Sequence, residues 1–251
     1  MDSKKLFFGL KRSKPDPKDK LVSICQAEKI ELPSSFSLKD KVKQVYDQLT
    51  LNSCSANAAA NFLSIAGLDC SISRLYMYFC TRYVDNNYMM PIADNGATLR
   101  SVFIAMSSYH YVEEVKYPYL IEKVNSIPPR EVFEEAITVN KSPITSYRQI
   151  LPSEYAIKYI ISQCKKPVLF GMMVYSNFFR LTKENDILSL PSSSDEMLGG
   201  HAVILCGFDD ASKTFEILNS HGSEFGNNGY FRLKYEYALN KDLCFEFYTV
   251  S

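Results

Sequence analysis

The chain has 251 residues, of which 46% are hydrophobic and 22% charged, and its 28 Lys and Arg balance its 28 Asp and Glu. This composition suits one large domain or two small lobes with a real core, and it excludes a disordered chain. The zero net charge argues against a basic nucleic-acid footprint. No stretch approaches the roughly 20 apolar residues of a membrane-spanning helix. We therefore expect neither nucleic acid nor a membrane as a partner.

The first part of the chain, residues 1–31, is polar and rich in lysine. Its apolar run, Leu6-Phe7-Phe8, is far shorter than the hydrophobic region of a signal peptide. We interpret residues 1–31 as an N-terminal extension rather than a folded unit, and as a candidate short pro-segment. Removing them should leave the rest of the chain folded and at least as active.

The seven cysteines are scattered through the chain and include no Cys-x-x-Cys pair. This pattern predicts neither a disulfide framework nor a zinc site. Together with the missing signal peptide, it favours a reducing, cytoplasmic location.

The globular sequence begins near residue 32, and its apolar patterns predict helices first and strands later. Helices are expected near residues 54–66, 73–83, 98–109, 130–136 and 154–164. Either Asn52 or Ser53 could cap the first helix, and Gly67 is a natural stop. Strands are expected at residues 168–174, 202–208, 214–218, 229–233 and 244–250. This order predicts an α+β protein with two lobes.

Only three histidines are available as a general base, and His201 has the most suggestive setting. It follows Gly199 and Gly200, which leave space for a cleft, and it precedes a strand that reads as buried. If the next two strands form a hairpin centred near residue 210, His201 lies opposite Asn219, with Cβ atoms about 4.5–5.5 Å apart. The Asn219 amide oxygen could then accept from one ring nitrogen and leave the other for chemistry.

Cys54 is the candidate nucleophile, because it stands at the start of the first predicted helix. Unpaired backbone N–H groups there lower a thiol pKa, and a thiolate beside an imidazolium is the activated nucleophile of acyl transfer. A purely structural Cys54, small among alanines, is the alternative on local grounds. The order of a Cys followed by His and Asn more than about 130 residues later favours catalysis.

Three stretches in this order resemble the motifs of papain-like cysteine peptidases: Gln48 six residues before Cys54, then Gly200-His201-Ala202-Val203, then Asn219-Ser220-His221-Gly222. The resemblance covers residues 32–251. It implies a papain-like fold, with a helical lobe, a β-rich barrel-like lobe and the active-site cleft between them. It also implies a catalytic Cys54, His201 and Asn219, and an oxyanion hole formed by the Gln48 side chain and the Cys54 N–H. Peptide or protein substrates are implied, with no metal and no organic cofactor.

Several positions depart from the family pattern. His221 and Phe225 replace the two tryptophans of the asparagine motif, so the bond between His201 and Asn219 should be less well shielded from water. Leu51 replaces a family cysteine, so the usual disulfide is lost. The chain resembles the compact, signal-less branch found in bacteria and large DNA viruses, and a viral source would imply a virion location.

A glycine segment pairs with the substrate backbone in this family. Asn95 and Gly96 are candidates for it, and Gly199 and Gly200 are further candidates for substrate binding. Two other functions stay open at this stage. One is a peptide ligase or transamidase, in which an amine resolves the acyl-enzyme. The other is a catalytically weakened binding module that keeps the fold.

Overall fold

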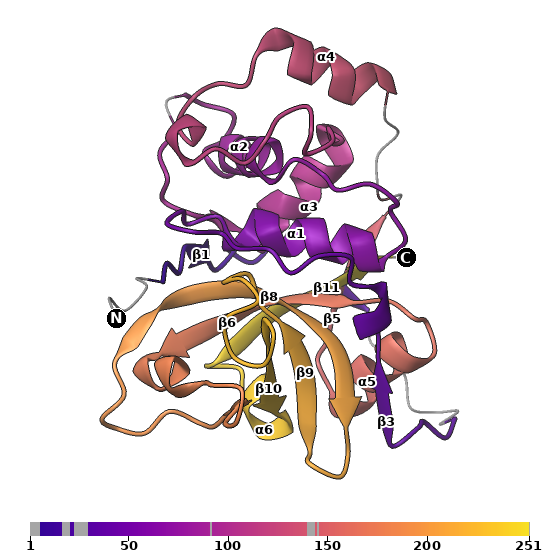
Figure 1. Cartoon of the computed structure of the whole chain (residues 1–251). Coiled ribbons are helices and arrows are strands. Elements are labelled where there is room, and N and C mark those ends of the chain that lie inside the picture. Colours follow the sequence, from indigo (N-terminus) through magenta and orange to yellow (C-terminus); the bar gives the residue numbers. More distant parts are fainter. Residues whose placement is uncertain are drawn as a thin grey trace.

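Helices gather in one lobe and strands in the other, with the longest apolar helix between them (Figure 1). The computed structural model describes residues 6–16, 21–22, 30–90, 92–139, 144 and 146–250. The helices are α1 (Cys54–Ile65), α2 (Arg74–Asp85), α3 (Leu99–Ser108), α4 (Arg130–Val139), α5 (Glu154–Ser162) and α6 (Tyr235–Ala238), with 3-10 turns η2 (Lys39–Lys41), η3 (Ile121–Lys123) and η4 (Ser176–Arg180). Helices α1 to α4 form the helical lobe, whereas α5 and α6 lie against the strands.

One mixed sheet organises the second lobe. Its strands are β1 (Leu10–Lys11), β2 (Leu21–Val22), β3 (Ser35–Ser37), β4 (Ala97–Thr98), β5 (Tyr147–Ile150), β6 (Val168–Tyr175), β7 (Ile187–Leu188), β8 (Met197–Asp209), β9 (Thr214–Leu218), β10 (Tyr230–Lys234) and β11 (Cys244–Val250). The main order is β2-β5-β11-β6-β8-β9-β10-β7, and β1 and β3 also pair with β8. Strand β8 is buried from Gly200 to Phe208, as a strand covered on both faces must be.

Helix α1 positions the site because it packs between the two lobes. Every residue of α1 except Ser64 is buried. The run Ala58-Ala59-Ala60 has high helix propensity and short side chains, so both lobes can approach the helix closely. Larger groups fill the space further along, where the Phe62 ring meets Phe103 of α3 edge-on, with ring centroids 5.6 Å apart.

The helices and strands predicted for the globular part are confirmed. Most of their boundaries differ from the predicted ones by a few residues. The N-terminal extension is more integrated than its composition suggests. Strand β1 pairs with β4 and β8, and β2 extends the sheet beside β5, so two pieces of residues 1–31 join the β-structure. Composition missed this because two-residue strands carry no periodic signal of their own.

Candidate active site

Cys54 is the first residue of α1 and is fully buried. Of the two expected caps, Asn52 and Ser53, the N-cap of α1 is Ser53, but its side chain makes no capping hydrogen bond to the helix. The Ser53 hydroxyl instead contacts the hydroxyl of Tyr119 and accepts from the Asn57 amide. Backbone groups of Ala202 and Gly9 lie close enough to the Cys54 sulfur to act to lower its pKa. Because Ala202 follows His201, the thiol lies beside the catalytic end of β8.

The His201 ring is held by Asn219. Its Nε2 lies 2.7 Å from Asn219 Oδ1, and both residues are buried. The other ring nitrogen, Nδ1, is buried without a hydrogen-bond partner in the part of the chain that the structure describes. An amide oxygen accepts and never donates, so Nε2 carries the proton in this pair and a neutral ring leaves Nδ1 unprotonated. The structure therefore brings together the predicted thiol, imidazole and amide.

The route to this pairing differs from the predicted hairpin. Strand β8 pairs with β9 through Ile204 and Leu218, and an irregularity between Leu205 and Gly207 shifts the register. When the pairing of Ile204 with Leu218 is extended toward His201, position 221 rather than Asn219 lies opposite His201. The expected direct opposition is thus wrong, and Asn219 lies diagonally to His201, a separation that an aromatic ring can span. The cause is the position of the turn, because Asp209 pairs with Thr214 and the hairpin is therefore centred beyond residue 210. The irregularity moves the register back by only one residue.

Aromatic rings enclose the His201–Asn219 pair. The His221 ring stacks on His201 with centroids 4.8 Å apart and planes 5° from parallel. Phe225 meets His221 at 5.6 Å, and Phe178 of η4 stacks on Phe225 at 4.9 Å. His221 therefore takes the covering place that the family gives to tryptophan. The sequence analysis missed Phe178, which lies in the short turn η4 between β6 and β7 and is fully buried there. A pair of phenylalanines between polar residues carries no periodic signal.

Gln48 is buried with its amide oriented by three contacts. Ser220 Oγ donates to Gln48 Oε1 at 2.8 Å, and Gln48 Nε2 donates to the Leu51 carbonyl at 2.8 Å. The same nitrogen donates to the carbonyl of Phe7 at 3.1 Å. The expected oxyanion donor thus already binds the carbonyl of a peptide group.

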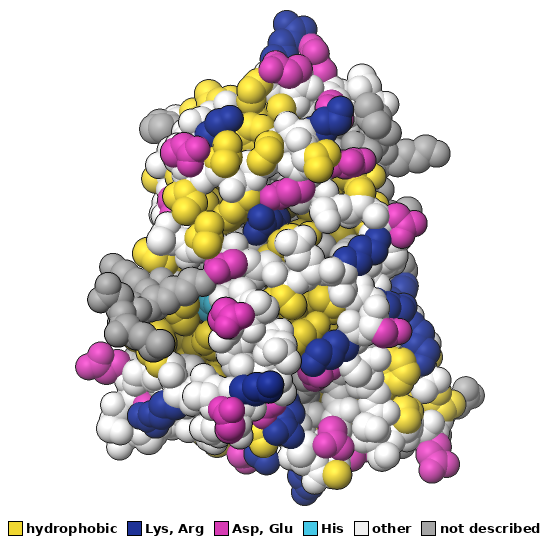
Figure 2. Space-filling model, viewed as in Figure 1, with side chains coloured by type: hydrophobic (Ala, Val, Ile, Leu, Met, Phe, Trp, Pro, Cys, Tyr) yellow, Lys and Arg dark blue, Asp and Glu magenta, His cyan; other side chains and the backbone are white. Residues whose placement is uncertain are grey.

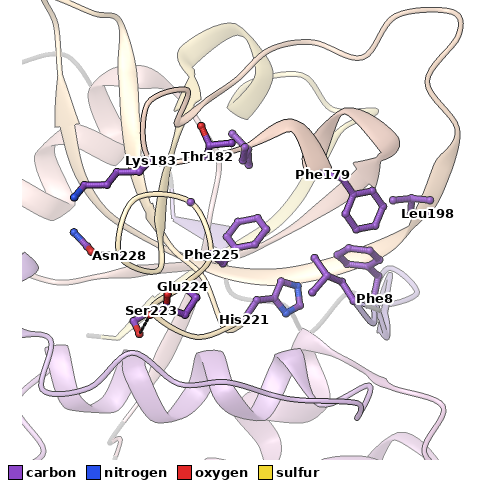
Figure 3. A pocket seen from close by; sticks show the side chains of 13 residues that line it. Phe8, Phe179, Thr182, Lys183, Leu198, His221, Ser223, Glu224, Phe225 and Asn228 are labelled. Atoms are coloured by element: carbon purple, nitrogen blue, oxygen red, sulfur yellow. Dashed lines mark hydrogen bonds between the residues drawn. The ribbon is translucent and has the colours of Figure 1, made fainter. Parts of the chain in front are cut away.

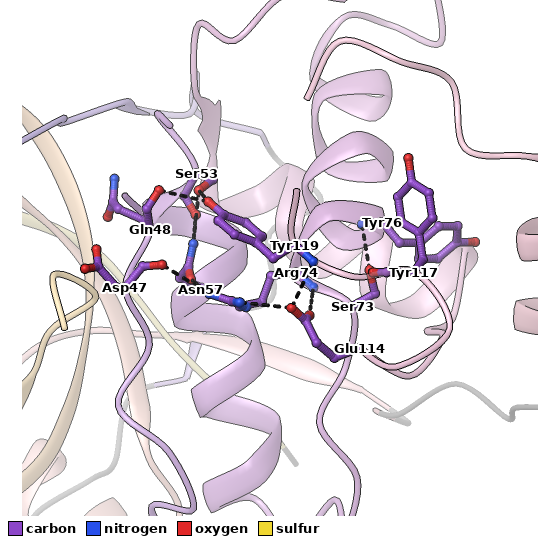
Figure 4. A network of polar contacts seen from close by, with 10 residues as sticks. All are labelled: Asp47, Gln48, Ser53, Asn57, Ser73, Arg74, Tyr76, Glu114, Tyr117 and Tyr119. Carbon is purple, nitrogen blue, oxygen red and sulfur yellow. Dashed lines mark hydrogen bonds and ion pairs between the residues drawn. The ribbon is translucent and has the colours of Figure 1, made fainter. Parts of the chain in front are cut away.

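A polar network behind the site fixes the loop that carries Gln48 (Figure 4). The Tyr119 hydroxyl donates to the Gln48 carbonyl at 3.0 Å. Arg74 of α2 donates to Asn57 Oδ1 at 3.0 Å and forms an ion pair with Glu114 at 2.9 Å. These residues tie the loop to α1 and α2. Sequence analysis alone could not identify these residues, because their partners are distant along the chain.

A peptide segment of the chain itself occupies the cleft. We call residues 6–16 the N-terminal segment. Gly9 forms a bridge with Gly200, and its carbonyl accepts from the Ala97 N–H at 3.2 Å. Leu10 then pairs with Ala97 in parallel and with Gly200 antiparallel. The N-terminal segment therefore runs between the two lobes and across Cys54, where Figure 1 shows β1.

The candidate substrate-binding residues all contact this segment. A Cβ added at Gly96 would lie 1.5 Å from the Gly9 carbonyl oxygen, and one at Gly200 would lie 2.3 Å from the Leu10 carbonyl oxygen. A Cβ at Gly199 would lie 2.9 Å from the Phe8 carbonyl oxygen. The Lys11 ammonium lies 3.4 Å from the Asn95 side-chain amide. These glycines lack a side chain where a peptide backbone passes, which is the reason a substrate site needs them.

Burial favours the uncharged forms of both Cys54 and His201. Burial raises the pKa of the Cys54 thiol above its usual value, although backbone hydrogen bonds from Ala202 and Gly9 oppose this. Burial lowers the pKa of His201 to about 4, against the opposing effect of Asn219. The expected depression of the Cys54 pKa is therefore wrong for this covered state. The physical reason is that the N-terminal segment excludes the water that would solvate an ion pair.

Other kinds of site find no support among the described residues. They contain no cluster of His, Cys, Asp and Glu that could hold a metal ion, and the six described cysteines are all free. No described helix is both long enough and apolar enough to cross a membrane. On the face shown in Figure 2, acidic and basic side chains are interspersed rather than gathered by sign.

Two lobes, a thiol at the start of the helix between them and a buried imidazole–amide pair are the features of a thiol peptidase. The model of the family described as papain family cysteine protease matches residues 32–245. The chain belongs to this family: it is a papain-like cysteine peptidase, a hydrolase that acts on peptides or proteins. The family, the two-lobed fold and the enzyme class expected from the sequence are therefore confirmed.

Relatives come from several sources. An uncharacterised peptidase C1-like protein of Acanthamoeba polyphaga mimivirus is 30% identical over 275 residues, covering 97% of this chain and 86% of that protein. A cathepsin B-like protein of Giardia intestinalis is 26% identical over 219 residues, covering 82% and 70%. The structure of Xylellain, a cysteine protease from Xylella fastidiosa, superposes with a TM-score of 0.84 at 26% identity, covering 97% of this chain and 95% of that one.

Proposed function

We propose that the chain hydrolyses peptide bonds through Cys54, His201 and Asn219, with Gln48 stabilising the oxyanion. The observation that carries this proposal is the 2.7 Å bond between His201 Nε2 and Asn219 Oδ1. It fixes the buried ring beside a helix-start thiol while Nδ1 keeps a lone pair for that thiol's proton. A ring placed only for packing would not need an oriented amide on one nitrogen and a vacant acceptor on the other.

The reaction follows from these roles. His201 takes the proton of Cys54, and the thiolate attacks the peptide carbonyl carbon, forming a C–S bond. The oxygen gains negative charge beside Gln48 Nε2, the group that here binds the Phe7 carbonyl. When the C–N bond breaks, the imidazolium gives its proton to the leaving amine. Water then loses a proton to His201 and attacks the thioester, which releases the acid and restores the thiol.

The N-terminal segment lies in the cleft in the non-productive direction, and we propose that it regulates access. The leaving amine must lie near His201, which protonates it, so the acyl part of a substrate lies on the opposite side of Cys54. Phe8 contacts the His201 ring, whereas Leu10 and Lys11 pair with β4 on the acyl side. The segment therefore enters from the leaving-group side, opposite to a substrate, and its own peptide bonds are not presented for cleavage.

The test is proteolysis of a mixed peptide library, with mass spectrometry of both products of each cut. It uses the full chain and its Gly9→Ala variant, in which the added Cβ would lie 2.4 Å from Asn52 Cβ and loosen the segment. Cys54→Ala should abolish all cleavage, whereas Cys80→Ala, a buried helical cysteine outside the site, should not. Cleavage that survives Cys54→Ala would refute the assignment. Products joined to an added amine, in place of free acids, would indicate a ligase.

A further inference from the structure

A second imidazole lies directly over the catalytic one. The ring of His221 is parallel to that of His201 within 5°, and the two ring centroids are 4.8 Å apart. Both residues are buried. The reaction proposed above uses no nitrogen of His221, and an apolar ring would cover the bond between His201 and Asn219 equally well. A buried titratable ring in contact with the general base is therefore a candidate for a further role in the reaction.

Aromatic rings surround the other sides of His221. Its ring centroid lies 5.6 Å from that of Phe225, 5.8 Å from that of Phe8 and 6.3 Å from that of Phe178. His221 also lines a cavity of about 1290 Å³, where Figure 3 shows its ring near Phe8 and Phe225. This cavity is far larger than a water molecule, so a proton from the medium can reach the His221 ring although the side chain is buried.

Charged groups approach His221 from more than one element. Asp47, in the loop before α1, forms a backbone bridge with His221, and a Cβ at Gly222 would lie 3.1 Å from Asp47 Oδ2. Glu224 lines the cavity, and Lys183 lies at the end of it away from His221 (Figure 3). The remaining facing groups are the His201 ring with the adjacent Cys54 thiol, and the uncharged rings of Phe8, Phe178 and Phe225. Carboxylates favour the charged form of a nearby imidazole, so a proton on His221 has a stabilising environment that does not depend on Cys54.

The charge that His201 acquires in the reaction develops against the face of His221. When His201 takes the Cys54 proton, it becomes an imidazolium, and the face of a neutral aromatic ring attracts a cation. If His221 is itself protonated, two positive rings lie 4.8 Å apart. At an effective dielectric constant of about 20, this repulsion opposes formation of the imidazolium roughly 10²- to 10³-fold. One proton on His221 is therefore sufficient to keep Cys54 in its thiol form.

We propose that His221 is a positioning residue that couples catalysis to pH: its neutral ring supports the His201 imidazolium, and its protonated ring prevents that imidazolium from forming. The inference rests on the proposed function, because only the proton transfer from Cys54 requires His201 to become charged. The tryptophan that the family has at this place could cover the pair but could not take up a proton, since an indole N–H only donates. We therefore expect the activity to be lost in acid at a higher pH than in a chain with a non-titrating ring at position 221.

The test follows alkylation of Cys54 by iodoacetamide between pH 9 and pH 4, in the full chain carrying Gly9→Ala. A thiolate–imidazolium pair gives a plateau of reactivity below the titration of an ordinary thiol, and the acid end of this plateau marks the loss of the pair. His221→Phe, added to Gly9→Ala, should move the acid end to lower pH by at least about one unit. Above about pH 8 the two chains should react at rates within roughly threefold of each other, because a histidine is neutral there.

Two further variants separate the titration of His221 from its role as a cover. His221→Trp, a larger ring that takes up no proton, should move the acid end as far as His221→Phe does, and it carries the test alone if urea denaturation shows that His221→Phe is unfolded. Phe225→Leu changes the neighbouring ring without removing a titratable group, and it should leave the acid end in place.

The outcomes distinguish the inference from the function on which it rests. An acid end that neither His221 variant moves, or that Phe225→Leu moves equally, would overturn the inference while the proposed function stands. If Cys54 instead titrates as an ordinary thiol in every chain, the ion pair does not form, and the proposed function fails together with the inference.

Discussion

Gly9→Ala tests the N-terminal segment without altering the wall of the cleft. Gly9 belongs to the segment, and a Cβ there would lie 2.4 Å from Asn52 Cβ and 2.6 Å from the Asn52 carbonyl oxygen. Contacts below 3.0 Å involving backbone atoms cannot be relieved by turning a side chain. The segment must therefore move away from the loop before α1, and its pairing with Ala97 and Gly200 must weaken.

The size of the effect follows from the cost of inserting one methyl group into a packed contact. Overpacking of this kind costs typically about 1–3 kcal/mol, which multiplies the open fraction roughly 5- to 150-fold. Reaction at Cys54 requires the open state, because the covered thiol is fully buried. The alkylation rate of Cys54 should rise by a similar factor, until the open state predominates.

The assay is alkylation with iodoacetamide, followed by peptide mass spectrometry. Cys164 is exposed and remote in sequence from the segment, so its labelling rate is an internal reference in every sample. Lys14→Ala, an exposed change in the same segment, is the matched control and should leave the Cys54 rate near that of the unaltered chain. If Gly9→Ala labels Cys54 no faster while Cys164 behaves alike in all samples, the segment does not control access and the reasoning fails.

Three further predictions concern the catalytic residues and the extension. Cys54→Ala should abolish peptidase activity and leave urea denaturation nearly unchanged, because one small side chain replaces another; turnover that persists while another cysteine variant is inactive would contradict this. Gln48→Ala should lower kcat about 10²- to 10³-fold with little change in thiol labelling, the scale for one oxyanion donor; equal losses would assign Gln48 to the nucleophile or the fold. A chain that begins near Glu31 should fold and be at least as active as the full chain in the library assay, and an insoluble product would show that β1 and β2 are structural.

The sequence predicted most of the secondary structure because the helices and strands of the globular part are long and regular in pattern. Gly199 and Gly200 before His201, and the order of Cys54, His201 and Asn219, indicated the candidate site in advance. The sequence could not predict the register of β8 against β9. The hairpin turn is centred beyond residue 210, so that the residue opposite His201 differs by two positions from the expected one, and nothing in the apolar pattern marks this.

The contents of the cleft were equally hidden. Leu6-Phe7-Phe8-Gly9-Leu10 is a short apolar run in a polar extension, with no periodicity to distinguish it from a solvated tail. Its structure is imposed by Gly96, Gly199 and Gly200, which lie far away in sequence and leave room for a backbone. The expected ionisation of Cys54 failed for the same reason, since burial by this segment is a tertiary effect.

The burial of His201 leads to a prediction about how the stability of the fold depends on pH. Burial lowers the pKa of His201 to about 4 in the folded chain, whereas an unfolded histidine titrates near 6.5. Folding therefore favours the neutral ring, so this stabilisation is complete above about pH 6.5 and is lost as the pH falls toward 4. The difference corresponds to about 2–3 kcal/mol of unfolding free energy at pH 4.

Urea denaturation between pH 7 and pH 4 should show that His201→Gln loses less stability than the unaltered chain by this amount. Hydrogen bonds lower the pKa of carboxyls such as Asp195 and Asp209, and the contributions of these groups cancel in that difference. Parallel curves for the two proteins would mean that the His201 ring is solvated, and that the segment does not seal the site.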